Sequence, residues 1–175
     1  QAELLLLPLQ ELQQALRDLE GSRAVLQSVV DTAPMRVFWK DRSLRYLGCN
    51  TAFAHDAGMH EPAELVGKDD FAMGWAAQAE QYREDDRKVM ASGQARLSYD
   101  EPQTTPDGNV IWLRTSKVPL RGSDGEIIGI IGLYEDITDR KRTEVALVES
   151  EQRYRAAFQT SLDAVSITRL ADDIY

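Results

Sequence analysis

Alternating apolar positions in the second half of the chain predict two long strands joined by a polar turn. Val110–Leu120 is rich in β-branched and aromatic residues, which favour strands. Ile127–Tyr134 is apolar on both of its alternating sets of positions, as expected of a strand covered on both faces. The dipeptides Asp107-Gly108 and Asp124-Gly125 precede the two runs and are typical of turns. We therefore expect a hairpin with a core or pocket on one side and a covering helix on the other.

Shorter elements are predicted ahead of this hairpin. Asn50 is a favoured residue for the start of a helix, and Gly93 is placed to end one. Strands are expected at Met35–Lys40, Leu44–Gly48 and Ala95–Thr105, helical turns at Pro62–Val66 and Phe71–Gly74, and a longer helix at Ala76–Ser92. The predicted order is two strands, several short helices and three strands.

The first 30 residues predict an amphipathic helix from Pro8, which suits a first helical turn, to Val30. Its apolar residues follow heptad spacing; this leucine stripe consists of Leu9, Leu12, Leu16, Leu19, Leu26 and Val30. The stripe fits either a helix packed on the sheet of its own domain or a two-stranded coiled coil. We favour a homodimer through the first half of the helix and sheet packing for the second half.

A second long helix is predicted after the hairpin, from Asp139 to about Phe158, with Thr138 as its N-cap. The stretch Thr160–Ile167 can be aligned with residues 32–39, because both follow a helix and both are short and apolar. Such an internal repeat predicts the first strand of a second domain, without the strands that it would pair with.

These features together resemble a PAS domain. The residues that carry the resemblance are the Gly-bounded final strand, its ending Asp136-Ile137-Thr138, the charged helix that follows, and the order of elements over about residues 32–138. The resemblance implies an α+β fold, with a PAS-like five-stranded antiparallel sheet, short helices on one face, and N- and C-terminal signalling helices at its ends. The expected divisions are a coiled-coil helix (1–31), the PAS domain (32–138), a linker helix (139–158) and a truncated first strand of a second PAS domain (159–175).

Composition narrows the possible partners and the cellular setting. The net charge of −9 argues against nucleic acid as a partner, since a duplex-binding face needs a basic stripe. The single cysteine, Cys49, forbids an internal disulfide and fits a cytoplasmic setting. The apolar run Leu4–Leu7 is too short to span a membrane, so we expect no membrane contact within this stretch and take the chain to be part of a longer protein.

Candidate catalytic chemistry is sparse. The chain has no nucleophile-elbow, P-loop or dinucleotide motif, so we expect no enzyme activity in this stretch. The acidic run Glu84-Asp85-Asp86 lies among basic residues, and we interpret it as a solvated helix face.

The candidate cofactors are judged partly from the resemblance. A haem-binding PAS sensor is expected to hold iron through a histidine on its longer helix, and Ala76–Ser92 has none, so haem is not expected. The only histidines, His55 and His60, are interpreted as surface or partly buried residues, and no metal site is predicted. Cys49 precedes Asn50, whereas light-sensing relatives have Gly-x-Asn-Cys, so we interpret Cys49 as an inert buried thiol. A non-covalent flavin or a small metabolite stays open.

A pocket beneath the sheet is the remaining candidate site. By resemblance to flavin-binding relatives, four residues match ligand-contacting positions, and strand alternation adds Thr115. The pocket candidates are Phe38, Met73, Trp75, Met90, Gln103, Leu113, Thr115 and Tyr134, with Gln103 and Tyr134 as polar groups that orient a ligand. These side chains could equally fill a core. On the opposite face, Trp39, Trp112, Arg114 and Leu133 are expected to need a cover, for which Leu26 and Val30 are candidates.

The resemblance implies a sensory module of a signal-transduction protein. A change in the pocket is expected to reach the next domain through Asp136, Ile137 and Thr138. The output, a histidine kinase or a cyclic-dinucleotide enzyme, and a downstream PAS domain are expected to be partners in the same chain. The alternative is a ligand-free PAS domain that serves only as a structural dimerisation module.

Overall fold

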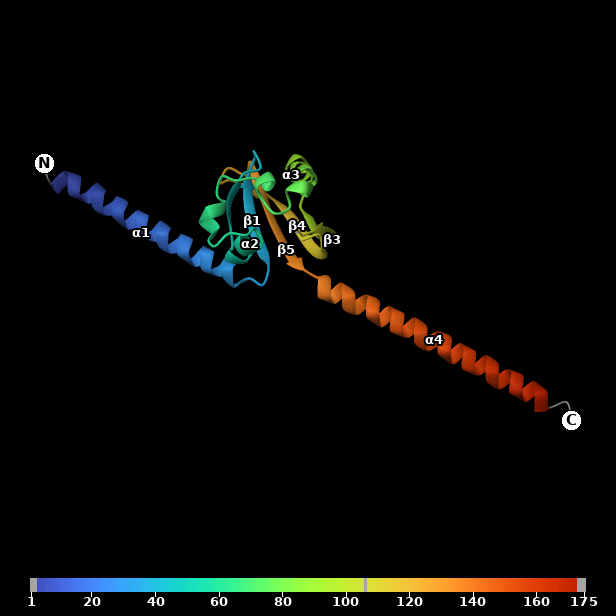
Figure 1. Cartoon of the computed structure of the whole chain (residues 1–175). Helices are drawn as coiled ribbons and strands as arrows, with labels where there is room; N and C mark the ends of the chain where they lie inside the picture. The colour runs from blue at the N-terminus through green and yellow to red at the C-terminus, as the bar shows by residue number, and fades with distance from the viewer. Residues whose placement is uncertain (1–2, 106, 173–175) are drawn as a thin grey trace. The chain divides into compact units, whose positions relative to one another are not determined.

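A five-stranded antiparallel sheet forms the centre of the chain (Figure 1), as predicted. The computed structural model describes residues 3–105 and 107–172. The strands lie in the order β2-β1-β5-β4-β3. Their bounds are Arg36–Asp41 (β1), Tyr46–Cys49 (β2), Arg96–Thr104 (β3), Val110–Arg121 (β4) and Ile127–Asp136 (β5).

Strand β5 lies in the middle of the sheet, between β1 and β4. It runs antiparallel to β1, with Phe38 opposite Gly132. Two glycines allow this packing. A Cβ atom at Gly132 would lie 2.1 Å from the Phe38 ring, and one at Gly129 would lie 1.9 Å from the carbonyl oxygen of Lys40. The absence of side chains at these positions therefore lets the backbone and the aromatic ring of β1 approach β5.

The helical layer follows β2 along the chain. It consists of α2 (Thr51–Asp56), η1 (Pro62–Leu65), η2 (Asp70–Ala72), η3 (Ala76–Gln78) and α3 (Ala79–Ser92). Asn50 caps α2 by accepting a hydrogen bond from the Phe53 N–H at 3.0 Å. Gly93 ends α3 in the left-handed conformation, with φ of 66°. Both end signals are confirmed.

The N-terminal helix α1 extends over Glu3–Thr32, so its expected start at Pro8 was wrong. Leucine is a good helix former, and a proline near the beginning of a helix removes only one of its backbone bonds. The helix ends at Thr32, two residues beyond the predicted end at Val30 and two residues before Pro34.

The C-terminal helix α4 is continuous over Thr138–Asp172, so the strand expected at Thr160–Ile167 is absent. A strand needs a neighbour for its backbone groups, whereas a helix satisfies them within its own segment. Residues 173–175, the end of the expected strand segment, lie outside the described residues. Whether 159–175 opens a second PAS domain stays a prediction.

Thr138 is the first residue of α4 rather than its N-cap. Instead, a side-chain oxygen of Asp136 accepts hydrogen bonds from the N–H and the hydroxyl of Thr138. A carboxylate near the first turn also complements the helix dipole. The capping function therefore belongs to Asp136, two residues earlier.

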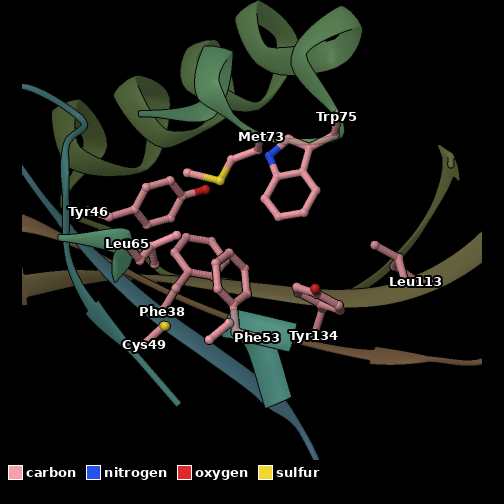
Figure 2. Close-up of a cluster of buried hydrophobic side chains, with 10 residues drawn as sticks. Phe38, Tyr46, Cys49, Phe53, Leu65, Met73, Trp75, Leu113 and Tyr134 are labelled. Atoms are coloured by element: carbon pink, nitrogen blue, oxygen red, sulfur yellow. The ribbon is translucent and has the colours of Figure 1, made fainter. Parts of the chain in front are cut away.

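The chain divides into two compact units, residues 1–135 and 136–175. Within the first unit, aromatic and aliphatic side chains from β1, β2, α2 and the helical turns form one buried cluster (Figure 2). Among the described residues, no helix is long and apolar enough to cross a membrane.

Candidate functional site

A small cavity lies where the inner face of the sheet meets the helical layer. Its volume is about 40 Å³, enough for roughly three water-sized positions. It is lined by Phe38, Lys40, Tyr46, Phe53, Asp70, Trp75, Tyr82, Glu101, Gln103, Leu113, Thr115, Lys117 and Tyr134. The lining thus combines an aromatic wall with buried charged groups.

The aromatic wall is centred on Phe53 of α2. Its ring centroid lies 4.8 Å from that of Phe38, 5.6 Å from Trp75 and 5.9 Å from Tyr134. The Trp75 and Tyr134 rings meet Phe53 edge-on, a favourable geometry for aromatic pairs. Figure 2 shows Trp75 descending from the helical layer toward the rings of Phe38 and Phe53.

Opposite charges form a buried cluster beside this wall, which we call the charge cluster: Lys40, Asp70, Asp86 and Lys117. The Lys40 Nζ lies 2.7 Å from Asp70 and 2.8 Å from Asp86, and the Lys117 Nζ lies 2.7 Å from Asp86. No member is more than 3% exposed. The lysines come from strands β1 and β4, and the aspartates from η2 and α3. The cluster therefore ties the sheet to the helices across the cavity.

Asp70 is also bound by the aromatic wall. The Tyr46 hydroxyl donates to it at 2.8 Å, and the Trp75 Nε1 lies at the longer distance of 3.5 Å. Burial and the negative charge of Asp70 raise the pKa of Tyr46 well above its usual value. Tyr46 therefore remains a neutral hydrogen-bond donor at physiological pH.

Glu101 of β3 also lines the cavity and is its second carboxyl group, after Asp70. Burial raises its pKa, although the neighbouring Thr115 hydroxyl and the Lys117 ammonium act in the opposite direction. A raised pKa favours the protonated acid, which donates a hydrogen bond as well as accepting one. Gln103, on the same strand, lines the cavity beside it.

Six of the eight predicted pocket residues line the cavity. Met73 belongs to the buried cluster but not to the lining, and Met90 is only half-buried and does not line the cavity. The inward face of α3 carries Ala79, Asp86 and Val89. Met90 lies one residue beyond that face, which is about 100° around the helix.

Seven lining residues were missed from the sequence: Lys40, Tyr46, Phe53, Asp70, Tyr82, Glu101 and Lys117. The interpretation of Glu84-Asp85-Asp86 as a solvated face is wrong for Asp86, which is 0% exposed. The sequence did contain a signal for the buried lysines. Lys40 follows Phe38, and Lys117 follows Thr115, at the strand period of two, so both lysines are at inward positions. Lysines at inward positions indicate buried carboxylate partners.

The other candidate residues lie outside the cavity. Cys49 is buried, and burial together with Asp31 raises its pKa to about 11, which fits an inert thiol. His55 and His60 are exposed. Among the residues that the structure describes, no group of His, Cys, Asp and Glu side chains could hold a metal ion.

The leucine stripe is uncovered in the single chain. Its members Leu9, Leu12, Leu16, Leu19 and Leu26 are between 51% and 66% exposed. Leu26 and Val30 line an open groove of about 900 Å³ that also contains Trp39. Leu26 and Val30 were expected to cover Trp39, and this cover is incomplete because Leu26 stays largely exposed.

The family model for the PAS fold matches residues 30–142 of the chain. The aerobic respiration control sensor protein ArcB of Escherichia coli K12 is 30% identical over 145 residues, covering 82% of this chain and 18% of ArcB. The methanogenesis regulatory histidine kinase FilI of Methanothrix harundinacea is 30% identical over 135 residues, covering 77% of this chain and 15% of FilI. The chain thus spans about a sixth of the length of these relatives.

Two solved structures are similar in sequence and shape. The PAS domain of Bordetella pertussis BvgS is 25% identical with a TM-score of 0.58, covering 75% of this chain and 98% of that one. VqmA bound to DPO is 27% identical with a TM-score of 0.57, covering 62% of this chain and 55% of that one.

Proposed function

This chain belongs to the PAS family and is a sensory signalling module, and we propose that its cavity binds a small ligand whose presence is relayed through the flanking helices. The observation that carries the proposal is the cavity itself, which places an aromatic wall and buried polar groups around an unfilled volume of about 40 Å³. Ligand sites typically combine an apolar lining with a few convergent polar groups. That the similar protein VqmA has been solved bound to DPO further supports the binding of a small ligand.

Helix α2 provides a route from the cavity to the N-terminal helix. It carries Phe53, the centre of the aromatic wall. At its start, the Asn50 Nδ2 donates to the carbonyl oxygens of Val30 and Met35, at 3.2 and 2.7 Å. The Thr51 N–H donates to Asp31 at 2.7 Å. A displacement of Phe53 would thus move the residues that hold the end of α1.

The other end of α2 is bonded to β5. The Tyr134 hydroxyl donates to Asp56 at 3.0 Å, and Arg36 forms an ion pair with the same carboxylate at 2.9 Å. Tyr134 lines the cavity and lies two residues before Asp136, which caps α4. One short helix therefore connects the cavity with both segments that we propose as relays. Such a switch requires two states that the ligand binds with different affinity.

Native mass spectrometry of the purified chain, combined with an absorbance spectrum and a thermal-shift screen, tests the sensor against the structural module. A co-purified small mass, a flavin band, or a raised melting temperature with a metabolite supports the sensor. A clean apo mass and no shift across the library would contradict it and favour a domain that only dimerises.

Asn50→Ala is expected to loosen the end of α1 and, through the lost acceptor of the Val37 N–H, strand β1, while β4 and β5 are affected less. The substitution removes a helix cap, worth about 1 kcal/mol, and the bonds to Val30 and Met35. Hydrogen exchange should therefore accelerate in residues 28–32 more than in β4 and β5. Asn109→Ala, in an exposed turn, is the control and should leave exchange in α1 unchanged. Equal acceleration in both variants would remove Asn50 from the relay.

We propose that the leucine stripe forms a homodimer. Leucines at heptad positions are stabilised by packing against a second helix, and the stripe is exposed in one chain. Replacing Leu12 and Leu16 together with Asp should give a monomer by light scattering. Gln10→Asp with Gln14→Asp adds the same charge off the stripe and should leave the dimer intact. A dimer that persists in the leucine variant contradicts the coiled coil.

The output domain that we propose is a histidine kinase, because ArcB is a sensor protein and FilI a histidine kinase. A cyclic-dinucleotide enzyme is the second candidate for the same position. We place both the output and any further PAS domain in the same polypeptide, beyond α4.

A further inference from the structure

Two buried ammonium groups line the cavity and retain hydrogen-bonding capacity. An ammonium has three N–H donors. Among the residues that the structure describes, Lys117 forms an ion pair with Asp86 at 2.7 Å and donates a hydrogen bond to the Tyr82 carbonyl oxygen at 3.1 Å. Lys40 is bonded to Asp70 and Asp86. Each lysine thus has one donor left for another partner.

The two carboxylates of the charge cluster lie against its lysines. One carboxylate oxygen of Asp86 accepts from Lys40, and the other forms an ion pair with Lys117. Asp70 accepts from Lys40 and Tyr46. Two lysines and two aspartates cancel in charge. The cluster therefore has no net charge of its own, and its two lysines, which line the cavity, still have N–H donors for a ligand.

The opposite side of the lining adds donors. Burial raises the pKa of Glu101, and a carboxyl group in its acid form can donate a hydrogen bond from a buried site. The Gln103 amide contributes an NH₂ group. A ligand that satisfies this site must accept hydrogen bonds from two sides while its remaining atoms contact aromatic rings.

We propose that the cavity binds a short-chain monocarboxylate, with its carboxylate oxygens on Lys117 and Lys40 and its hydrocarbon end against the aromatic wall. This rests on the proposed function, because it names the ligand class of that same site. A carboxylate accepts charge-assisted bonds from ammonium groups, which are stronger than those to a neutral carbonyl. The volume of about 40 Å³ limits the ligand to the size of acetate or slightly larger.

Three probes of similar size separate the possible chemistries: sodium acetate, acetamide and ethylammonium chloride, titrated at constant ionic strength. Binding is followed by NMR chemical shifts of the full chain. Acetate should give saturable shifts at cavity residues, including Gln103 and Lys117. Acetamide should bind at least about tenfold more weakly, since it lacks the charge, and ethylammonium should not saturate.

A charge-balanced double variant, Lys117→Met with Asp86→Asn, tests the proposed contact. It removes one ammonium and one carboxylate together, so no unpaired charge is left in the interior. Acetate affinity should fall at least about tenfold, while acetamide affinity should change less. Lys88→Met, on the exposed side of α3, removes the same charge and should leave acetate binding unchanged.

The inference is overturned if ethylammonium or acetamide binds more tightly than acetate, or if the double variant binds acetate as well as the original chain does. In those cases the cavity still takes a ligand, and the sensor proposal survives. If no probe binds and no small molecule co-purifies, both proposals fail. The ranking of the three probes on the unsubstituted chain decides the ligand class even if the double variant does not fold.

Discussion

Asp86→Ala is expected to lower the free energy of unfolding by about 3–5 kcal/mol, because removing one partner of a buried ion pair leaves the other charge uncompensated. Asp86 is fully buried and bonded to two lysines. Lys40 would keep Asp70, but Lys117 would keep only the Tyr82 carbonyl oxygen. Because whole domains are stable by about 5–15 kcal/mol, urea unfolding followed by circular dichroism should show a large shift in midpoint.

Glu84→Ala is the matched control, since Glu84 lies on the same helix and pairs with Arg87 and Lys88 at the surface. Exposed pairs contribute at most about 1 kcal/mol, so its midpoint should move little. If Asp86→Ala and Glu84→Ala unfold at the same urea concentration, the charge cluster does not hold the helical layer to the sheet.

Gly129→Ala should destabilise the sheet by about 3 kcal/mol or more, at the upper end of the usual effect of overpacking. The added methyl group would lie 1.9 Å from the carbonyl oxygen of Lys40. This oxygen belongs to the backbone of the neighbouring strand, so it cannot rotate away as a side chain could. The pairing of β1 with β5 must shift instead, and thermal unfolding should show a much lower melting temperature.

Gly21→Ala provides the contrast on α1, where a Cβ atom would meet no other atom within 4 Å. Alanine is favoured over glycine in a helix by about 0.5–1 kcal/mol, so this variant should be unchanged or slightly more stable. An equal loss of stability in both variants would contradict the steric explanation for Gly129.

The resemblance to PAS domains, together with the period of two along the strands, predicted much of the sheet side of the cavity. Phe38, Leu113, Thr115 and Tyr134 all line it, as strand alternation and the PAS resemblance suggested. The helical side was less predictable. Short helical turns have no long amphipathic pattern from which the inward residues could be identified. Trp75 lines the cavity as predicted, whereas Met73 does not.

The charge cluster was missed because its members are far apart in the sequence. Lys40 is 30 residues from Asp70 and 46 from Asp86. Charged residues are mostly exposed, and nothing local distinguishes Asp86 from its solvated neighbours. Only the folded arrangement brings the carboxylates to the inward-facing lysines. The helical course of residues 160–167 escaped prediction for a related reason, since apolar content alone does not distinguish a short strand from a helix.

The strand order β2-β1-β5-β4-β3 places β1 beside the last strand to be synthesised. Residues 36–41 must wait for residues 129–134, so a ribosome has to extend the chain through nearly the entire domain before the sheet can close. Long-range pairing of this kind slows folding. During translation, the β1–β2 hairpin is therefore a nascent segment with both edges open, and the edge of β1 closes only when β5 has been made.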